Sequence, residues 1–294
     1  MGLAACLEMD GRKVIAARTR SADAPTKVVP VILQHEDARV EVPVETIGLS
    51  RLPQLDGLVA VTAKAYANGD IARALRNRPC GPLVLLQNGL HVEEPFLEEH
   101  PAEIYRAVLY VSSDEISENQ FRFHSIRSSP IGIVSGSREG LDAAVASLTT
   151  DQFPFHAEAN LDREVWKKAI INAVFNSICP LLDTDNGVFV RSREIAELAN
   201  LVVLECISLT QKLGLGLTGD ELMQIIMQIS ESSDGELIST LHDMRAGRET
   251  EISYLNLEIA RTGASQRPTI ELPRTEMLGR MILEKSKNQM MARH

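Results

Sequence analysis

The sequence predicts an α/β protein whose N-terminal half forms a parallel sheet and whose C-terminal half is all helical. Up to about residue 160, short apolar strands alternate with helical segments, which is typical of a parallel sheet. Beyond that point every segment has helical periodicity. Single cores stop growing at about the size of this chain, 294 residues, so we expect two domains, residues 1–160 and 161–294.

The composition excludes several classes of protein. A formal charge of −10 without any basic run argues against a nucleic-acid partner. No apolar stretch is long enough to span a membrane, and the first ten residues lack a secretory signal, so we expect a cytoplasmic protein. The cysteines (Cys6, Cys80, Cys179 and Cys206) are far apart and the histidines are scattered, so we expect neither disulfides nor a metal site.

The elements of the first half follow from apolar runs and turn residues. The run 58–62 and the run 83–87 are continuous buried strands, and a helix should follow each of them. The other expected elements are a helix over 2–10 that ends at Asp10-Gly11, a strand over 14–17, a hairpin of 28–34 with 39–44, strands over 106–111, 121–126, 131–134 and 153–156, and a helix over 140–148. In the second half we expect the helices to break near 183–187, 214–218, 247 and 267–268.

Two buried strands of the first half end in polar residues. Lys64 follows the strand 58–62, and Asn88 follows the strand 83–87. Ligands of open α/β sheets bind beyond the carboxyl ends of the strands, so both are candidate binding residues. The structural alternative is a lysine at a helix start and an Asn-Gly turn, and for either residue alone it is favoured.

The first long helix of the second half, which begins near Trp166, carries a polar column. Lys168, Asn172 and Asn176 are spaced four apart, so they lie on one side of the helix. Their neighbours are apolar, and a helix that is apolar almost all round should be buried. Buried polar groups need partners, so we expect a cleft between the halves to gather this column with Lys64 and Asn88. In the structural alternative, the asparagines tie helices together and the lysine reaches the rim.

A second polar segment, residues 239–251, separates apolar helices. Ser239 and Asp243 lie one turn apart, and Gly247 can close that helix. Glu251 falls in the first turn of the next helix, where the helix dipole alone would favour a carboxylate. If Glu251 instead faces Lys168, each supplies the counter-charge that the other needs for burial, and the pair could perturb the lysine enough for proton transfer.

Five pieces of the chain, in order, resemble the ketopantoate reductase (2-dehydropantoate 2-reductase) family. They are Val61-Thr-Ala-Lys64, Leu85-Leu-Gln-Asn88-Gly89, Trp166-Lys-Lys168 with Asn172 and Asn176, Asp185-Asn186-Gly187, and Asp243-Met-Arg-Ala-Gly-Arg248-Glu-Thr250-Glu251-Ile. Each piece alone is a weak signal. Together they cover nearly the whole chain, so the resemblance is specific to the superfamily.

The resemblance implies a Rossmann-type N-terminal domain that binds NADPH, a helical C-terminal domain, and an active site between them. The activity it implies is NADPH-dependent reduction of ketopantoate to pantoate, a reaction of pantothenate and coenzyme A biosynthesis. It makes Lys168 the general acid and Glu251 its partner and second catalytic group. It places Asn88 and Lys64 at the cofactor. The residues that it implies for the substrate, a small 2-oxo acid, are Asn172, Asn176, Asn186 and Ser239.

The chain departs from the family at its start. The family begins with an apolar strand and the fingerprint Gly-x-Gly-x-x-Gly, and Gly2 aligns with the third glycine. We therefore expect the first strand and the first two glycines to be missing from this sequence. Either the natural chain starts upstream of Met1, which we favour, or the protein is short and cannot hold the dinucleotide in the usual way.

Two further departures concern cofactor and substrate. Arg18 and Arg20 stand where an NAD-specific domain carries an acidic residue, so we expect NADP, although both could be plain surface arginines. Asn256-Leu257 replaces the usual Asn-Gly, which leaves the exact 2-oxo acid open. A related 2-oxo acid reductase and a truncated, non-catalytic binding module are the alternatives. A homodimer is possible, because the helical half could bury apolar faces internally or across a dimer.

Overall fold

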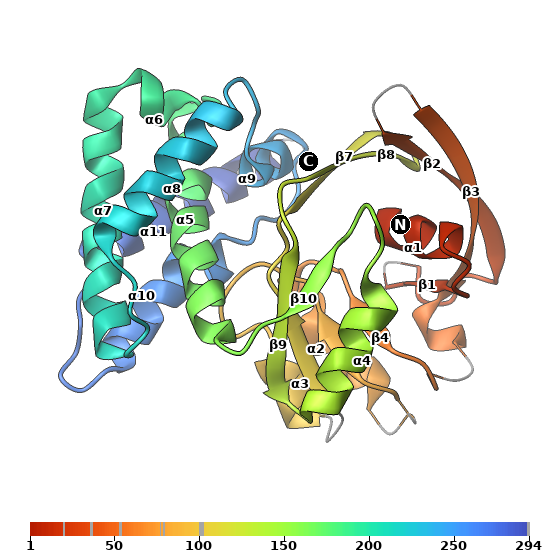
Figure 1. Ribbon diagram of the computed structural model, residues 1–294. Helices are drawn as coiled ribbons and strands as arrows, with labels where there is room; N and C mark the ends of the chain where they lie inside the picture. Colours follow the sequence, from red (N-terminus) through yellow and green to blue (C-terminus); the bar gives the residue numbers. More distant parts are fainter. Residues whose placement is uncertain are drawn as a thin grey trace. The chain divides into compact units, whose positions relative to one another are not determined.

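The computed structural model describes residues 1–19, 21–35, 38–52, 55–76, 78, 80–99 and 103–292. The chain divides into two compact units (Figure 1). The sheet unit comprises Met1–Ala63, Ala67–Gln87 and Glu93–Leu161. The helical unit comprises Asp162–His294 together with two short loops from the N-terminal half, Lys64–Tyr66 and Asn88–Val92.

The sheet unit contains two five-stranded sheets. The first has the order β1-β3-β2-β8-β7, formed by Ile15–Arg18, Ala38–Gly48, Lys27–His35, Gln120–Ser125 and Val111–Ser117. The second has the order β10-β9-β6-β5-β4, formed by Phe155–Ala157, Ser129–Ser135, Ile104–Ala107, Leu83–Leu85 and Val59–Val61. The buried runs predicted at 58–62 and 83–87 are neighbouring parallel strands of the second sheet, β4 and β5.

The expected single parallel sheet was wrong in detail. Both sheets are mixed, because β2 pairs antiparallel with β3, β7 with β8, and β6 with β9. The strand β7 was not expected, since its sequence Val-Ser-Ser-Asp-Glu-Ile-Ser is mostly polar. It is a strand because its backbone pairs with β8, and β8 in turn continues the first sheet by pairing parallel with β2.

The helices of the sheet unit are α1 (Gly2–Met9), α2 (Asn68–Leu75), α3 (Glu94–Glu99) and α4 (Arg138–Leu148), with a short 3-10 helix η1 (Leu49–Arg51). Of these, α1 and α4 pack on one apolar core. Ala5 and Cys6 of α1 are fully buried against residues of both sheets, among them Val44 and Tyr105. The helix α4 begins where the Ser137 hydroxyl accepts a hydrogen bond from the Gly140 N–H, at 3.0 Å.

Gly2 lies where only glycine fits. A Cβ there would overlap the ring of Phe123 on β8. We expect Gly2→Ala to lower the free energy of unfolding by about 1–3 kcal/mol, because the ring must move out of a packed core. Gly57→Ala is the matched control, since a Cβ at Gly57 meets no atom within 4 Å. Urea denaturation measures both variants, and equal stabilities for the two would contradict this packing.

The helical unit surrounds α5 (Leu161–Leu182), the predicted long helix (Figure 1). The others are α6 (Val188–Arg191), α7 (Arg193–Lys212), α8 (Gly219–Ser232), α9 (Ser239–Arg245), η3 (Ile252–Tyr254), α10 (Asn256–Ser265) and α11 (Pro273–Met291). Ala169, Ile170, Ala173 and Val174 of α5 are buried, as expected for a helix that is apolar almost all round. The breaks predicted near 183–187, 214–218, 247 and 267–268 lie between helices, whereas those at 192 and 233–238 were not predicted. Glu251 was expected in the first turn of a helix, but it precedes η3, and α10 begins only at Asn256.

Side chains fix the starts of these helices. The hydroxyls of Ser192 and Thr218 cap α7 and α8, because each accepts a hydrogen bond from the backbone N–H three residues further along the chain. The first turn of α11 is capped from a distance, because the Glu205 carboxylate accepts from the N–H of Arg274 at 3.0 Å and of Thr275 at 2.9 Å. In the described part of the chain, no helix combines the length and the apolar character needed to cross a membrane.

Candidate active site

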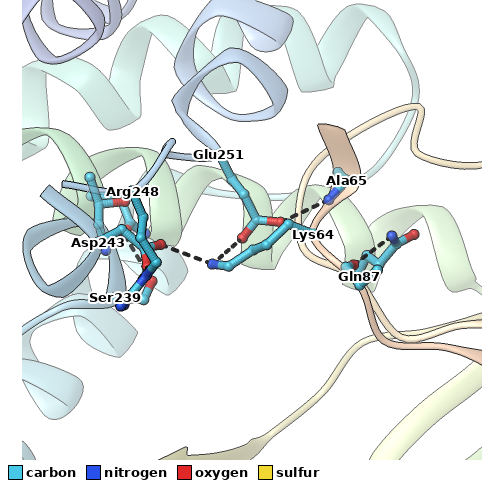
Figure 2. A network of polar contacts seen from close by, with 10 residues as sticks. Lys64, Ala65, Gln87, Ser239, Asp243, Arg248 and Glu251 are labelled. Carbon is cyan, nitrogen blue, oxygen red and sulfur yellow. Dashed lines mark hydrogen bonds and ion pairs between the residues drawn. The ribbon is translucent and has the colours of Figure 1, made fainter. Parts of the chain in front are cut away.

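Lys64 lies between two carboxylates of the helical unit (Figure 2). Its Nζ donates to Glu251 Oε2 at 3.0 Å and to Asp243 Oδ2 at 3.1 Å. The side chains of both acids are 8% exposed, whereas that of Lys64 is 37% exposed. Buried carboxylates need such partners, so the ammonium is part of what holds Glu251 and Asp243 in place.

Glu251 has a partner on each carboxylate oxygen. Besides Lys64, it accepts a hydrogen bond from the backbone N–H of Ala65 at 3.2 Å. We expected Lys168 to be its counter-charge; the contacts in the structure are instead with Lys64 and Ala65, a correction to the pairing. The sequence pattern could not show this, because the loop from Lys64 to Tyr66 joins the helical unit only in three dimensions.

The surroundings of Lys64 raise its pKa. Burial is the largest influence and lowers the pKa, but attraction to Glu251, then to Asp243, together with the hydrogen bonds to both, outweighs it. The side chain is therefore a permanent cation near neutral pH. A general acid works best with a pKa near the working pH, so Lys64 suits charge stabilisation and binding better than proton donation.

The members of the polar column of α5 differ in burial and in contacts. Lys168 and Asn172 are half-buried, and Asn176 is 3% exposed. Asn176 Oδ1 accepts from the Thr240 N–H at 3.3 Å and from the Ser239 hydroxyl at 3.4 Å. Its Nδ2 donates to the Asn172 carbonyl at 3.0 Å. Asn176 thus ties α5 to the start of α9, the structural alternative considered for this residue, and through that contact it places Ser239.

Asn186 offers an acceptor that lacks a donor. The residue is buried, with 6% of its surface exposed, and the side-chain oxygen Oδ1 has no hydrogen-bond partner within the described ranges. The preceding Asp185 carboxylate fixes the loop by accepting from the N–H of Gly187 at 2.8 Å and of Gly235 at 3.3 Å. A buried acceptor without a donor is costly, and the hydroxyl of a small ligand would satisfy it.

Asn88 is positioned by the turn that follows Glu251. The N–H of Leu90 donates to the Tyr254 carbonyl at 2.8 Å. Gly89 has φ +104°, and a Cβ there would lie 2.7 Å from the Cβ of Tyr254. The Asn-Gly turn therefore requires its glycine twice, for the backbone angle and for the close approach. The loops after β4 and β5 consequently both dock on residues 251–254.

The residues expected on the cofactor side belong to the sheet unit. Arg18 is exposed at the end of β1, and Arg20 lies outside the described residues. The packing of Gly2 on Phe123 is what the third glycine of a dinucleotide fingerprint does, close packing of helix on strand. An exposed guanidinium suits a phosphate, so Arg18 fits a nicotinamide dinucleotide. In the described part of the chain, no group of three or more His, Cys, Asp or Glu side chains could hold a metal ion.

Sequence reasoning missed two members of the network around Lys64. Asp243 accepts from Lys64, and Arg248 donates from Nε to Asp243 Oδ1 at 2.8 Å (Figure 2). The unusual polarity of residues 239–251 was the available signal, and the one-turn spacing of Ser239 and Asp243 placed them together. The N–H of Ala65 left no signal, since every residue but proline has one.

The four cysteines differ in burial, so we expect them to differ in reactivity. Burial is the main cause that raises the pKa of Cys6, Cys179 and Cys206 to about 12, whereas Cys80 is half-buried and its pKa is also raised by burial. At about pH 8 we expect iodoacetamide to modify Cys80 first and the other three only after unfolding, because the thiolate is the nucleophile. Peptide mass spectrometry reads out the order, and prompt labelling of Cys206 in folded protein would contradict the packing.

The same thiols make stability depend on pH. A raised pKa in the folded state means that the folded protein holds protons more tightly, so this contribution is fully present below the ordinary thiol value of about 8.5. It is lost as the pH rises from there through the raised values. We therefore expect urea denaturation midpoints to fall on the alkaline side.

Comparisons with known proteins agree with this architecture. Residues 160–286 match the family described as ketopantoate reductase PanE/ApbA C terminal. A 2-dehydropantoate 2-reductase of Archaeoglobus fulgidus is 25% identical over 213 residues, 72% of this chain and 71% of that protein. A PanE/ApbA family ketopantoate reductase from Ralstonia eutropha JMP134 superposes with a TM-score of 0.84 at 21% identity, covering 98% of this chain and 95% of that one.

A D-mandelate dehydrogenase, solved with NADH and anilino(oxo)acetate, has a similar fold. Its TM-score is 0.83 at 16% identity, covering 98% of this chain and 95% of that one. These alignments confirm a sheet domain followed by a helical domain. They give no support to the expected absence of a first strand, since nearly all of the Ralstonia protein is matched. Residues 160–286 therefore match the C-terminal domain of the ketopantoate reductase family, and the chain as a whole is similar to members of that family in sequence and fold.

Proposed function

We propose that the protein reduces ketopantoate to pantoate with NADPH. The observation that supports this best is the composition of the helical unit. It contains Lys168 and Glu251, and it also takes in Lys64 and Asn88 from the N-terminal half. One compact unit thus holds two cations, a carboxylate and an amide, the groups that reduction of a charged ketone requires.

In this proposal Lys168 is the general acid. Reduction of a ketone adds a hydride to the carbonyl carbon and leaves negative charge on the oxygen, which then takes a proton. An ammonium on a largely apolar helix stabilises that charge and supplies the proton. When bound, NADPH supplies the hydride. The half-buried position of Lys168 on α5 suits this role, because water competes less there.

The remaining polar groups bind and orient. Lys64 is the permanent cation, anchored by Glu251, and Asn88 faces cofactor and substrate from its fixed turn. Asn172 and Ser239 bind the substrate, and Asn176 contributes indirectly because it holds the start of α9 in place. Asn186 Oδ1 would accept the hydroxyl of the substrate. On the cofactor side, Arg18 and Arg20 would bind the 2′-phosphate, and Gly2 would let α1 approach its neighbouring strand.

A related 2-oxo acid is the second candidate substrate, and one contact favours keeping it. Leu257 stands where the family that this chain resembles usually has glycine, and its side chain packs on Gly279 of α11. A Cβ at Gly279 would lie 2.8 Å from Leu257 Cδ2. The bulk of Leu257 is thus accommodated by the glycine opposite it on α11.

Purified protein assayed with NADPH and a panel of 2-oxo acids tests the proposal. We expect the highest kcat/KM for ketopantoate, with NADPH preferred over NADH. A higher value for an aromatic acid such as phenylglyoxylate would select the second candidate. If none of the 2-oxo acids is reduced and NADPH causes no thermal shift, a non-catalytic binding protein is favoured. The oligomeric part of the proposal is a homodimer, which sedimentation equilibrium tests.

A further inference from the structure

The network around Lys64 includes a residue that does not contact the lysine itself, Arg248. Asp243 uses its two oxygens for different cations, Oδ2 for Lys64 at 3.1 Å and Oδ1 for Arg248 Nε at 2.8 Å. A terminal guanidinium nitrogen of Arg248 also lies 2.8 Å from Oδ1. The side chain of Asp243 is 8% exposed and that of Arg248 is 49% exposed. The two cations and the two carboxylates of Glu251 and Asp243 therefore balance in charge (Figure 2).

The backbone brings Arg248 to this position. After α9 ends, Gly247 adopts φ +67°, a conformation that glycine enters at little cost. The chain turns back, and the Arg248 N–H donates to the Asp243 carbonyl at 2.8 Å. The main chain of Arg248 thus binds the Asp243 carbonyl and its side chain binds the carboxylate, so Arg248 helps to orient this carboxylate independently of Lys64.

The ammonium of Lys64 has a third N–H that can donate to a ligand. An ammonium has three N–H groups, and two of those of Lys64 go to carboxylates of the described residues. The side chain is 37% exposed, so the third N–H can reach a ligand oxygen. A flexible lysine holds one direction only if its other donors are fixed, and here Asp243 and Glu251 fix them.

We propose that Asp243 and Arg248 are positioning residues, which orient the Lys64 ammonium so that its third N–H meets an oxygen of the bound cofactor or substrate. This rests on the proposed function for the identity of those ligands. Arg248 acts on Asp243, Asp243 acts on Lys64, and neither touches the reacting atoms. The ligand oxygen is either the nicotinamide carboxamide or the substrate carboxylate.

Acylation of Lys64 tests the arrangement without any turnover. Acetic anhydride modifies only the neutral amine, and the charged groups that face Lys64 are Glu251 and Asp243, with Arg248 behind the latter. In Asp243→Asn we expect Lys64 to react about three- to tenfold faster, because loss of a neighbouring negative charge favours the neutral amine. Lys212, exposed at the end of α7, is the internal control and should not change. An unchanged Lys64 rate in folded Asp243→Asn overturns the proposal.

A double-mutant cycle tests Arg248 and separates positioning from a plain structural role. We expect Arg248→Met to lower kcat/KM about tenfold, since small misplacements of a binding group are costly, and Arg248→Lys to recover part of the loss. In a Lys64→Met background, Arg248→Met should have no further effect. An undiminished effect in that background overturns the proposal.

The cycle also shows whether Lys64 binds the nicotinamide carboxamide or the substrate carboxylate. A change confined to the KM of NADPH identifies the carboxamide, and a change confined to the KM of the oxo acid identifies the carboxylate. If Lys64→Met leaves no measurable turnover, the same cycle is run on the dissociation constant of NADPH. Where wild-type protein reduces no 2-oxo acid, the proposed function fails, while the acylation experiment still decides whether Asp243 holds Lys64.

Discussion

Replacing Lys168 by alanine is expected to lower kcat for 2-oxo acid reduction by about 10²–10⁴-fold, the usual contribution of a general acid. The fold should survive, because Lys168 is only half-buried and alanine is a good helix former in α5. The measurement is steady-state oxidation of NADPH, with the thermal midpoint recorded for each protein. The loss should appear in kcat more than in KM, since the proton is needed only as the ketone is reduced.

Lys167→Gln is the matched control for that substitution. Lys167 precedes Lys168 on the same helix, is buried, and pairs with Glu164 one turn earlier. Its loss should cost stability and leave kcat near the wild-type value. Undiminished turnover in folded Lys168→Ala, or an equal loss in Lys167→Gln, would remove Lys168 from the reaction.

Glu251→Gln is expected to lower kcat/KM about 100-fold, because it releases Lys64 from one of its two anchors. The amide oxygen can still accept from the Ala65 N–H, so the turn after Glu251 should keep its shape. Loss of a hydrogen bond to a charged group should lower the free energy of unfolding by about 1–2 kcal/mol, the low end of the range because Lys64 is partly solvated.

The stability part of this effect has a defined pH dependence. Lys64 has a raised pKa in the folded state, so its contribution is fully present below the ordinary lysine value of about 10.4. It disappears as the pH rises through the raised value, where wild type and variant should converge. Glu249→Gln is the control, since Glu249 is exposed in the same segment. If the stabilities of the two variants depend on pH in the same way, the anchoring of Lys64 by Glu251 does not contribute to stability.

Much of the fold follows from local sequence. The runs at 58–62 and 83–87 could be predicted as strands because apolar residues fill them, and α5 because it lacks glycine and has no proline before Pro180. The division of the sheet could not be predicted. It depends on pairings between strands far apart in the chain, such as β2 with β8, and β7 owes its conformation to pairing with β8 in spite of its polar sequence.

The site was predictable in its members more than in its contacts. Lys64, Asn88 and Glu251 were singled out by position, yet 187 residues separate Lys64 from Glu251, and no periodic pattern spans such a distance. Lys168 was assigned to Glu251 because both bear charge in apolar surroundings. The structure pairs Glu251 with the other lysine, a choice made by the path of the loop after β4.

Deuterium transfer is the most direct test of the central claim, that this chain reduces a 2-oxo acid with a proton from Lys168. The protein is incubated with ketopantoate and NADPH that carries deuterium at the transferred position, and the product is analysed by mass spectrometry. We predict pantoate with one deuterium on the carbon that bore the ketone, formed by wild type and by Lys167→Gln and nearly absent with Lys168→Ala. Folded wild-type protein that labels no 2-oxo acid, or Lys168→Ala that labels it as fast as wild type, would contradict the claim.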